Sequence, residues 1–353
     1  MTDRHPKAIV MLSGGLDSTL AAKIVQDQGV ELHGLHLALP WGCCDRGKAQ
    51  SSAALLGIPF TILKVKREFL DVVRQPKYGY GREMNPCVDC RSYMLKLAGK
   101  FMPLVNADFV VTGEVVGQRP NSQLKRSMRI IERESGLEGR LLRPLSARYL
   151  APTEAEQRGW VDRSNLFNLT GRSRKRQIGL AAKLGIDEQP APSGGCLLTE
   201  KPFGSRVRDL FQNQSEIDLE DLELLRLGRH FRISPNTKIV VGRNETENQM
   251  LRSLNLNSAV TLATVAFPGP VSVIVGEISE RSIGTAVRII VYYAKPQRLG
   301  LDSIALKLNE ETLLNFVLKE LEPLSVEELD TWRLAILDLP RTGPSSYQAC
   351  RAV

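Results

Sequence analysis

The chain has 353 residues, of which 42% are hydrophobic and 24% charged, and its net charge is +8. This composition is typical of a globular protein with about two domains and excludes low-complexity, collagen-like and disulfide-framework classes. No segment approaches the ~20 apolar residues of a membrane span, and residues 1–7 lead directly into a predicted strand rather than a signal peptide. We therefore expect a cytoplasmic protein whose six cysteines serve thiol or metal chemistry.

The first predicted element is a buried parallel strand, because residues 8–12 form an uninterrupted apolar run. A strand, a glycine turn and a helix in this order point backbone N–H groups at an anion. The turn is not a Walker A loop, since no Gly-Lys-Ser/Thr follows it. The alternative is an ordinary tight turn in which Ser and Asp cap the helix. The turn reads Ser13-Gly14-Gly15-Leu16-Asp17-Ser18, and apolar residues at helical spacing continue at Leu20 and Ile24.

Strand and helix patterns alternate through the first half of the chain. This order predicts an α/β fold with a doubly wound parallel sheet, in which ligands bind at the carboxyl ends of the strands. The glycine turn and Thr112-Gly113-Glu114 both follow predicted strands and should meet there. The expected strands are Glu31–Leu39, Pro59–Val65 and Ala107–Thr112, and the expected helices are Lys48–Leu56, Cys90–Phe101 and Ser173–Leu184.

The pattern changes after a Pro/Gly cluster at residues 190–195, which marks a domain boundary or an active-site loop. We expect a first domain at 1–189, a smaller α+β domain at 190–300 and a helical tail at 301–353. The α+β domain is predicted to contain a helix at Asp218–Leu227 and β-rich runs at Thr237–Val241, Ala259–Val265, Val271–Val275 and Gly284–Ala294. The tail is predicted to contain helices at Glu310–Lys319 and Val326–Leu337.

Positive charge is concentrated between Arg119 and Lys183, where 15 Lys or Arg face 6 Asp or Glu. Such a band suggests a polyanionic partner such as RNA. The alternative interpretation is that these charges form a solvated helical face without a partner. The candidate RNA-binding residues in this band are Arg119, Arg172, Arg174, Lys175 and Arg176.

Three cysteines form a second candidate site. Cys87 and Cys90 make a CxxC motif before a helix, where a thiol becomes a better ligand or nucleophile, and Cys196 follows the Pro/Gly cluster. Three thiols are too few for a closed zinc site but suit a cluster with one open iron, or a pair of catalytic sulfurs. The alternative is that they are small buried hydrophobic residues. Cys43 and Cys44 are candidates to join this site, but we expect them to pack in the core near the nucleotide, and we assign no role to Cys350.

The glycine turn resembles the pyrophosphatase (PP) loop of the N-type ATP pyrophosphatases, an adenine nucleotide alpha-hydrolase-like superfamily whose members split ATP between the α and β phosphates. Taken with further motifs it is similar to the tRNA 4-thiouridine synthetase branch, and tRNA 2-thiouridylases share the loop and the two-site cysteine layout. These motifs are Thr112-Gly113-Glu114-Val115-Val116-Gly117-Gln118, Ser122-Gln123 and Arg143-Pro144-Leu145.

The resemblance implies roles for individual residues. The loop would hold the phosphates of ATP and Mg²⁺ through Ser13, Gly14, Gly15, Asp17 and Ser18, with Asp17 also catalytic. The nucleotide and the target base would be lined by Thr112, Gly113, Glu114 and Gln118. Sulfur would be delivered by Cys87, Cys90 and Cys196, either as catalytic thiols or as ligands of a [4Fe-4S] cluster whose open iron holds sulfide.

Two segments, Leu225–Phe231 and Val240–Asn248, are similar to the NFACT-R type of RNA-binding domain. Arg243 and Asn244 would offer donors to a phosphate or a base. The alternative is a turn in which Asn244 only caps the following helix. His230, close to the first segment, is expected to be a packed or surface histidine.

These observations predict an ATP-dependent tRNA uridine thiolase that releases AMP and pyrophosphate and takes sulfur from sulfide or a cysteine desulfurase persulfide. One alternative is sulfur transfer or amidation on a small molecule, and another is a non-catalytic RNA-binding protein. The sequence leaves open the nucleoside, the choice between cluster and persulfide, and whether the enzyme is a homodimer.

Overall fold

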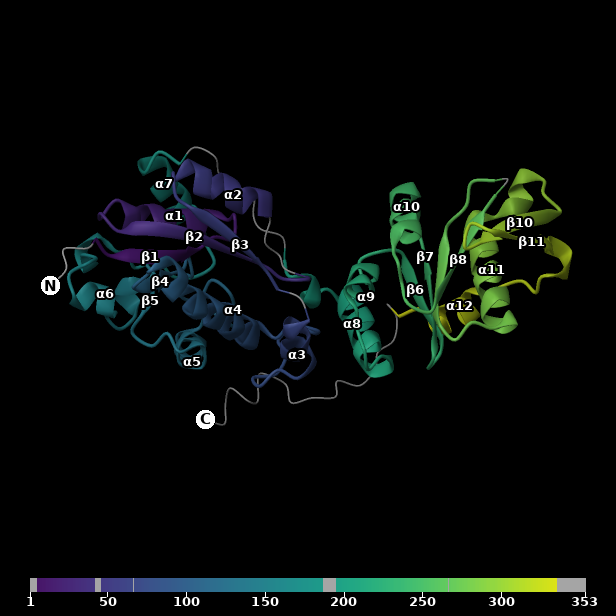
Figure 1. The fold of residues 1–353 in the computed structure, drawn as a ribbon, viewed down its shortest axis with the longest axis horizontal. Helices are drawn as coiled ribbons and strands as arrows, with labels where there is room; N and C mark the ends of the chain where they lie inside the picture. The colour runs from purple at the N-terminus through teal and green to yellow at the C-terminus, as the bar shows by residue number, and fades with distance from the viewer. Residues whose placement is uncertain (1–4, 42–45, 66, 187–194, 266, 335–353) are drawn as a thin grey trace. The chain divides into compact units, whose positions relative to one another are not determined.

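The computed structural model describes residues 5–41, 46–65, 67–186, 195–265 and 267–334 (Figure 1). The chain divides into two compact units, with the boundary between Leu197 and Leu198. Most of the Pro/Gly cluster and the residues Cys43, Cys44 and Cys350 lie outside the described ranges. No helix in the part of the chain that the structure describes is long and apolar enough to cross a membrane.

The N-terminal unit is built on a five-stranded sheet in the order β3-β2-β1-β4-β5, and every neighbouring pair is parallel. This arrangement confirms the expected α/β class. The short fifth strand was not predicted, because two leucines give no periodicity to recognise. The strands are β1 (Lys7–Met11), β2 (Glu31–Ala38), β3 (Phe60–Lys64), β4 (Phe109–Val111) and β5 (Leu141–Leu142).

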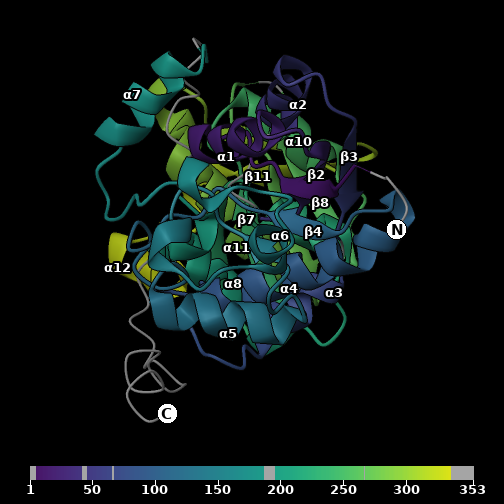
Figure 2. The same cartoon turned by 90° about the vertical axis from the view of Figure 1, so that its left-hand side faces the viewer.

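Helices cover both faces of this sheet, as Figures 1 and 2 show. In β1 the side chains alternate: Ala8 and Val10 pack in one apolar core, and Ile9 and Met11 pack in the other. Because both faces are buried, the strand appears in the sequence as a continuous apolar run. One face carries α1 (Leu16–Gln26), α2 (Arg46–Leu55) and α7 (Lys175–Lys183); the other carries α4 (Cys87–Phe101) and α5 (Lys125–Ser135); α3 (Glu68–Arg74) and α6 (Glu154–Gln157) complete the unit.

The strand order reverses direction between β1 and β4. In a doubly wound sheet, the connections on the two sides of such a reversal diverge and leave a crevice at the carboxyl ends of the strands. The chain leaves β1 into the glycine turn and leaves β4 into Thr112-Gly113-Glu114, so both candidate motifs enter this crevice.

The C-terminal unit contains a six-stranded sheet in the order β11-β10-β8-β9-β7-β6, with every neighbouring pair antiparallel. Its strands are β6 (Arg229–Ser234), β7 (Thr237–Val241), β8 (Ala259–Thr264), β9 (Ser272–Gly276), β10 (Ser303–Leu308) and β11 (Thr312–Val317). Its helices are α8 (Lys201–Asn213), α9 (Leu219–Leu224), α10 (Glu245–Ser253), α11 (Glu280–Ala294) and α12 (Val326–Trp332).

Two predictions for this unit were wrong. Gly284–Ala294 is the body of helix α11 and not a strand; Ser279 caps the helix, and its buried Ala286, Val287 and Ile290 follow helical spacing. The expected helix at Glu310–Lys319 is mostly strand β11.

In β11 the side chains alternate between the packed Leu314 and Phe316 and the exposed Leu313 and Val317. The tail from residue 301 therefore adds a hairpin to the sheet, and only α12 in its described part is an α-helix.

Candidate functional site

The loop after β1 is closed by its own hydroxyl groups. Ser18 Oγ donates to the carbonyl of Gly15 at 2.8 Å and accepts from the backbone nitrogen of Ser13 at 3.3 Å. Gly15 is the N-cap of α1; the backbone nitrogen of Ser18 donates to the Gly15 carbonyl at 3.1 Å, and the helical N–H groups before it have no partner within the helix. The loop thus presents backbone donors and the positive end of an eleven-residue helix to an anion.

Two glycines make the close packing of this loop feasible. Gly14 has a φ of +76°, and a Cβ there would lie 2.6 Å from Cβ of Lys48 on α2. A Cβ on Gly113 would lie 2.5 Å from the backbone nitrogen of Ser18 and would overlap the backbone of Asp17. The segment after β4 therefore lies directly on the backbone of the loop after β1.

These two segments enclose a pocket of about 280 Å³. Of the nine residues that the sequence suggested for phosphate and nucleotide binding, all but Gly14 line it; Gly14 lies against α2 instead. Sequence reasoning missed Arg91, although its position next to the CxxC motif on one helix was a usable signal. The lining residues are Met11, Ser13, Gly15, Leu16, Asp17, Ser18, Arg91, Thr112, Gly113, Glu114, Gln118, Arg119, Gln123 and Arg174.

Asp17 is the acidic group of the loop. Its Oδ2 accepts from Nε2 of Gln118 at 2.8 Å, while Oδ1 is buried without a hydrogen-bond partner. Burial raises the pKa of Asp17, and the hydrogen bond from Gln118 and the charges of Arg174 and Arg119 oppose this shift. A buried carboxylate oxygen without a partner is a hard donor of the kind that Mg²⁺ prefers, so this residue fits the expected magnesium site.

Glu114 is 2% exposed and lies among arginines. Its Oε2 accepts from Nε of Arg143 at 2.9 Å, and its Oε1 lies 3.5 Å from Nε of Arg91. Burial alone would raise the pKa of Glu114, but the charges of Arg143 and Arg91 outweigh it and hold the pKa below its usual value. Arg143, itself 1% exposed, is also paired with Glu132 on α5. The carboxylate therefore holds Arg91 at the wall of the pocket and the buried Arg143 behind it.

The three candidate cysteines are half-buried thiols of the N-terminal unit. Helix α4 begins at Cys87, and Sγ of Cys90 lies 4.0 Å from Sδ of Met94. No group of three or more His, Cys, Asp or Glu side chains in the described ranges is arranged to hold a metal ion. The described residues therefore do not show a ligand set for a [4Fe-4S] cluster.

The candidate RNA-binding residues separate into two groups within the N-terminal unit. Arg119 and Arg174 line the pocket, whereas Arg172, Lys175 and Arg176 are exposed at the start of α7. The pocket thus holds three guanidinium groups, including that of Arg91, and its charge suits a phosphorylated ligand.

In the C-terminal unit, Asn244 caps α10 by accepting from the backbone nitrogen of Glu247 at 2.9 Å, and Arg243 is paired with the same glutamate. The local geometry is therefore that of the capped turn named as the alternative above. His230 is buried, its Nε2 lies 2.8 Å from the carbonyl oxygen of Leu227, and burial lowers its pKa well below the usual value. It is a packed histidine, as expected.

The fold and the pocket together define a nucleotide-binding α/β domain joined to a second domain. Residues 6–132 match the family model of the tRNA methyl transferase HUP domain, and residues 228–333 match that of the NFACT protein RNA binding domain. The N-terminal unit is thus similar to a HUP domain and part of the C-terminal unit to an NFACT-R RNA-binding domain, in agreement with both predicted resemblances.

Curated relatives are similar over parts of the chain. A tRNA-specific 2-thiouridylase MnmA of Acidithiobacillus ferrooxidans is 40% identical over 98 residues, which are 25% of this chain and 27% of that protein. The MnmA of Rippkaea orientalis is 30% identical over 64% of each chain. A solved 4-thiouridine synthetase–RNA complex with bound ATP has 21% identity and a TM-score of 0.33, covering 51% of this chain and 52% of that one. The match spans 27% of the length of the Acidithiobacillus protein and 64% of the length of the Rippkaea protein.

We predict that Gly113→Ala loosens the pocket, because its Cβ would overlap the backbone of Asp17. The expected loss is about 1–3 kcal/mol in the free energy of unfolding, together with weaker ATP binding. Urea denaturation and an ATP titration measure the two effects. Gly179→Ala on α7, where a Cβ meets nothing within 4 Å, is the control and should not destabilise the protein. Wild-type stability and ATP affinity in Gly113→Ala would contradict the predicted contact.

Glu114→Gln removes the charge that faces Arg143 and Arg91 and should destabilise the protein by about 3–5 kcal/mol at pH 7. The pKa of Glu114 is lower in the folded protein than its usual value of 4.5. The ionised carboxylate therefore stabilises the fold fully above pH 4.5, and this stabilisation is lost as the pH falls through the folded pKa. Urea denaturation should show a constant difference in the free energy of unfolding between Glu114→Gln and wild type from pH 5 to 8, and this difference should shrink below pH 4.5. Glu154→Gln, at an exposed ion pair, should change little.

Proposed function

We propose that the chain is an ATP-dependent tRNA sulfurtransferase that replaces a carbonyl oxygen of a uridine with sulfur. The observation that carries this proposal is one pocket in which the β1 loop, the Thr112–Gln118 segment and the helix of the CxxC motif all take part. This pocket contains groups that can bind a nucleotide, and one of its lining residues belongs to the helix that carries the CxxC thiols.

The first step is activation of the base. The uridine carbonyl oxygen attacks the α-phosphorus of ATP, the bond to the bridging oxygen breaks, and pyrophosphate leaves. The backbone donors of the loop hold the departing phosphates, and the guanidinium groups of Arg119 and Arg174 offset the charge that develops. Asp17 would hold Mg²⁺, which would neutralise further negative charge on the phosphates. Catalysis here consists of positioning and charge stabilisation by this chain's own groups.

The second step is sulfur transfer. A persulfide on one of the candidate thiols attacks the activated carbon through its terminal sulfur, and AMP leaves with the former carbonyl oxygen. A second thiol then attacks the inner sulfur and releases the thiocarbonyl, which leaves a disulfide. An external dithiol, or two external thiols, returns two electrons to that disulfide and is itself oxidised to a disulfide before the next turnover, and a cysteine desulfurase persulfide replaces the transferred sulfur. If sulfide itself is the nucleophile, no disulfide forms.

The position of the CxxC motif on α4 supports a role for its thiols. Cys90 and Arg91 follow Cys87 by three and four residues, so both lie next to Cys87 on one side of the helix. Of these three residues Arg91 lines the pocket, whereas Cys90 packs partly against an apolar core of the sheet, so Arg91 is the observation that supports an approach of α4 to the nucleotide. Cys196 lies in the same unit and is proposed as the partner thiol.

The proposed substrate is tRNA, and the proposed location is the cytoplasm. The match to an RNA-binding domain over residues 228–333 supports an RNA substrate, and the thiouridylase relatives support tRNA. The basic residues at the start of α7 would contact the phosphate backbone. The alternatives named above, a small-molecule substrate and a non-catalytic RNA-binding protein, are outcomes of the same experiment.

Deleting the gene should remove one thiolated uridine from bulk tRNA, as measured by mass spectrometry of its nucleosides. Cys87→Ala, Cys90→Ala and Cys196→Ala should each fail to restore it while still binding ATP, and Cys350→Ala, to which we assign no role, should restore it. An unchanged nucleoside profile would contradict the tRNA proposal, and restoration by all three variants would contradict the role of the thiols. Iron analysis of the anaerobic protein separates the persulfide route, which needs no iron, from a cluster.

A further inference from the structure

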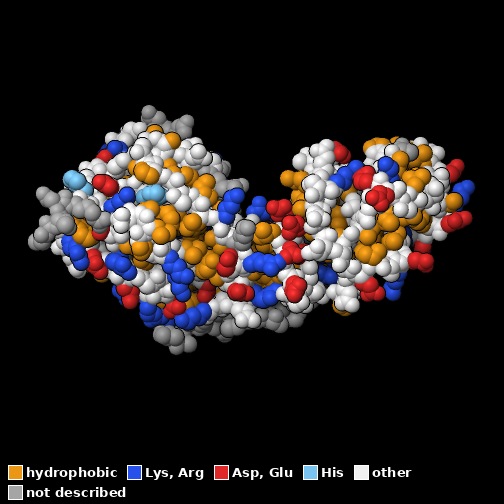
Figure 3. All heavy atoms as spheres, in the orientation of Figure 1, with side chains coloured by type: hydrophobic (Ala, Val, Ile, Leu, Met, Phe, Trp, Pro, Cys, Tyr) orange, Lys and Arg blue, Asp and Glu red, His pale blue; other side chains and the backbone are white. Residues whose placement is uncertain are grey.

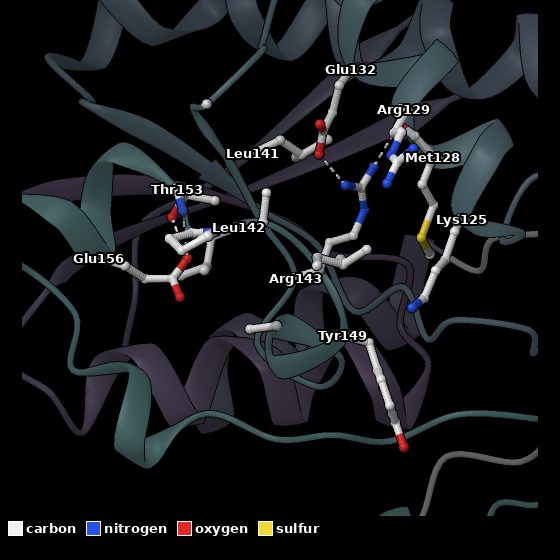
Figure 4. A pocket seen from close by; sticks show the side chains of 15 residues that line it. Lys125, Met128, Arg129, Glu132, Leu141, Leu142, Arg143, Tyr149, Thr153 and Glu156 are labelled. Atoms are coloured by element: carbon white, nitrogen blue, oxygen red, sulfur yellow. Dashed lines mark hydrogen bonds and ion pairs between the residues drawn. The ribbon is translucent and has the colours of Figure 1, made fainter.

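The N-terminal unit holds a second cavity of about 120 Å³, bounded by the start of α5, strand β5 and the segment that follows it (Figure 4). We propose that this cavity binds one nucleotide of the RNA substrate next to the nucleotide that reacts. The inference rests on the proposed function. The lining residues that carry it are Lys125, Arg129, Glu132, Arg143, Tyr149 and Glu156.

Both carboxylates of the cavity are already neutralised. Glu132 is paired with Arg143, an interaction that Figure 4 shows at the cavity wall. Glu156 is paired with Arg163 and also accepts from the backbone nitrogen and hydroxyl of Thr153, at 2.7 and 2.8 Å. Neither glutamate therefore opposes an anionic ligand, and the charge of Lys125 and Arg129 is left to act on it.

An aromatic ring and a cation lie together at one side of the cavity. Tyr149 is 41% exposed, and Nζ of Lys125 lies 5.3 Å from the centre of its ring. A cation–π pair at an exposed site is weak, so a base can replace the ammonium on the ring while Lys125 moves to the phosphate. Apolar Met128 and Leu142 line the interior, as a stacked base requires. Single-stranded RNA is recognised in this way, by stacking on aromatic rings and by charge on the backbone.

The first turn of α5 carries cations and no acid, which is unfavourable for the helix itself. Its first five residues include Lys125, Arg126 and Arg129 and no acid, although cations are unfavourable near a helix N-terminus. In Figure 3, Lys and Arg side chains gather along the edge of the N-terminal unit where Figure 1 labels α5. A polyanion that crosses this edge would offset the unfavourable charge of the helix.

The cavity is connected to the nucleotide pocket through one side chain. Arg143 lines the cavity and also binds Glu114, which lines the pocket. A nucleotide in the cavity is therefore a close neighbour of the base that reacts. This proximity favours a flanking nucleotide of the same RNA over an unrelated ligand.

The test uses the full chain and an unmodified tRNA transcript, with the Kd measured by fluorescence anisotropy at one fixed salt concentration. Tyr149→Ala removes the stacking surface, and Lys125→Ala removes the cation. Tyr149→Phe keeps the ring. Lys64→Ala removes an exposed cation from edge strand β3, at the opposite end of the sheet from β5. The Kd for ATP and a titration with UMP are measured for each protein.

Tyr149→Ala and Lys125→Ala should each raise the Kd for tRNA about tenfold, as expected for the loss of one stacking or phosphate contact. Tyr149→Phe and Lys64→Ala should stay within twofold of wild type, and the ATP Kd should not change. Equal tRNA affinity of Tyr149→Ala and wild type would overturn the inference while the proposed function stands. The inference would also be overturned if wild type binds UMP and Tyr149→Ala loses this binding while its Kd for tRNA stays the same. A wild-type protein that neither binds nor thiolates tRNA would overturn both.

Discussion

The close approach of Gly113 to the backbone of Asp17 and Ser18 is the constraint on which the candidate site depends. It joins the segments that leave β1 and β4, the two strands between which the sheet order reverses. Only a residue without a side chain permits this approach, and the approach brings Glu114 and Gln118 to the wall of the loop pocket. The pocket is therefore a consequence of strand order and one glycine rather than of any local motif alone.

Electrostatic interactions then set the character of the pocket. Taking Glu114 out of water is costly unless its charge is paired, and the charges of Arg143 and Arg91 pair with it, although Oε1 has no hydrogen-bond partner. Arg91 connects this network to the helix of the CxxC motif, and Arg143 connects it to the second cavity through Glu132. A buried carboxylate thus links the nucleotide pocket to the proposed source of sulfur on one side and to the proposed RNA subsite on the other.

Much of the N-terminal unit could be predicted from the sequence, because strands buried on both faces and amphipathic helices leave clear patterns, and the glycine turn has a defined context. Predictions failed where local residue preference and tertiary packing disagree. The β-branched residues of α11 favour a strand, yet their spacing buries one helix face, and the leucines of β11 favour a helix until their alternate burial is known. Arg91 was missed because its role depends on which side of α4 faces the pocket, and that is decided by packing.

The central claim is that ATP activates a carbonyl oxygen of RNA, and the fate of that oxygen tests it most directly. A tRNA transcript made with uridine labelled by ¹⁸O in its carbonyl groups is incubated with the enzyme, ATP and a sulfur source, and the released AMP is analysed by mass spectrometry. The account predicts one ¹⁸O atom in AMP for each thiouridine formed, with pyrophosphate as the other product. Thiouridine formed with unlabelled AMP, or with ADP and phosphate as products, would contradict it.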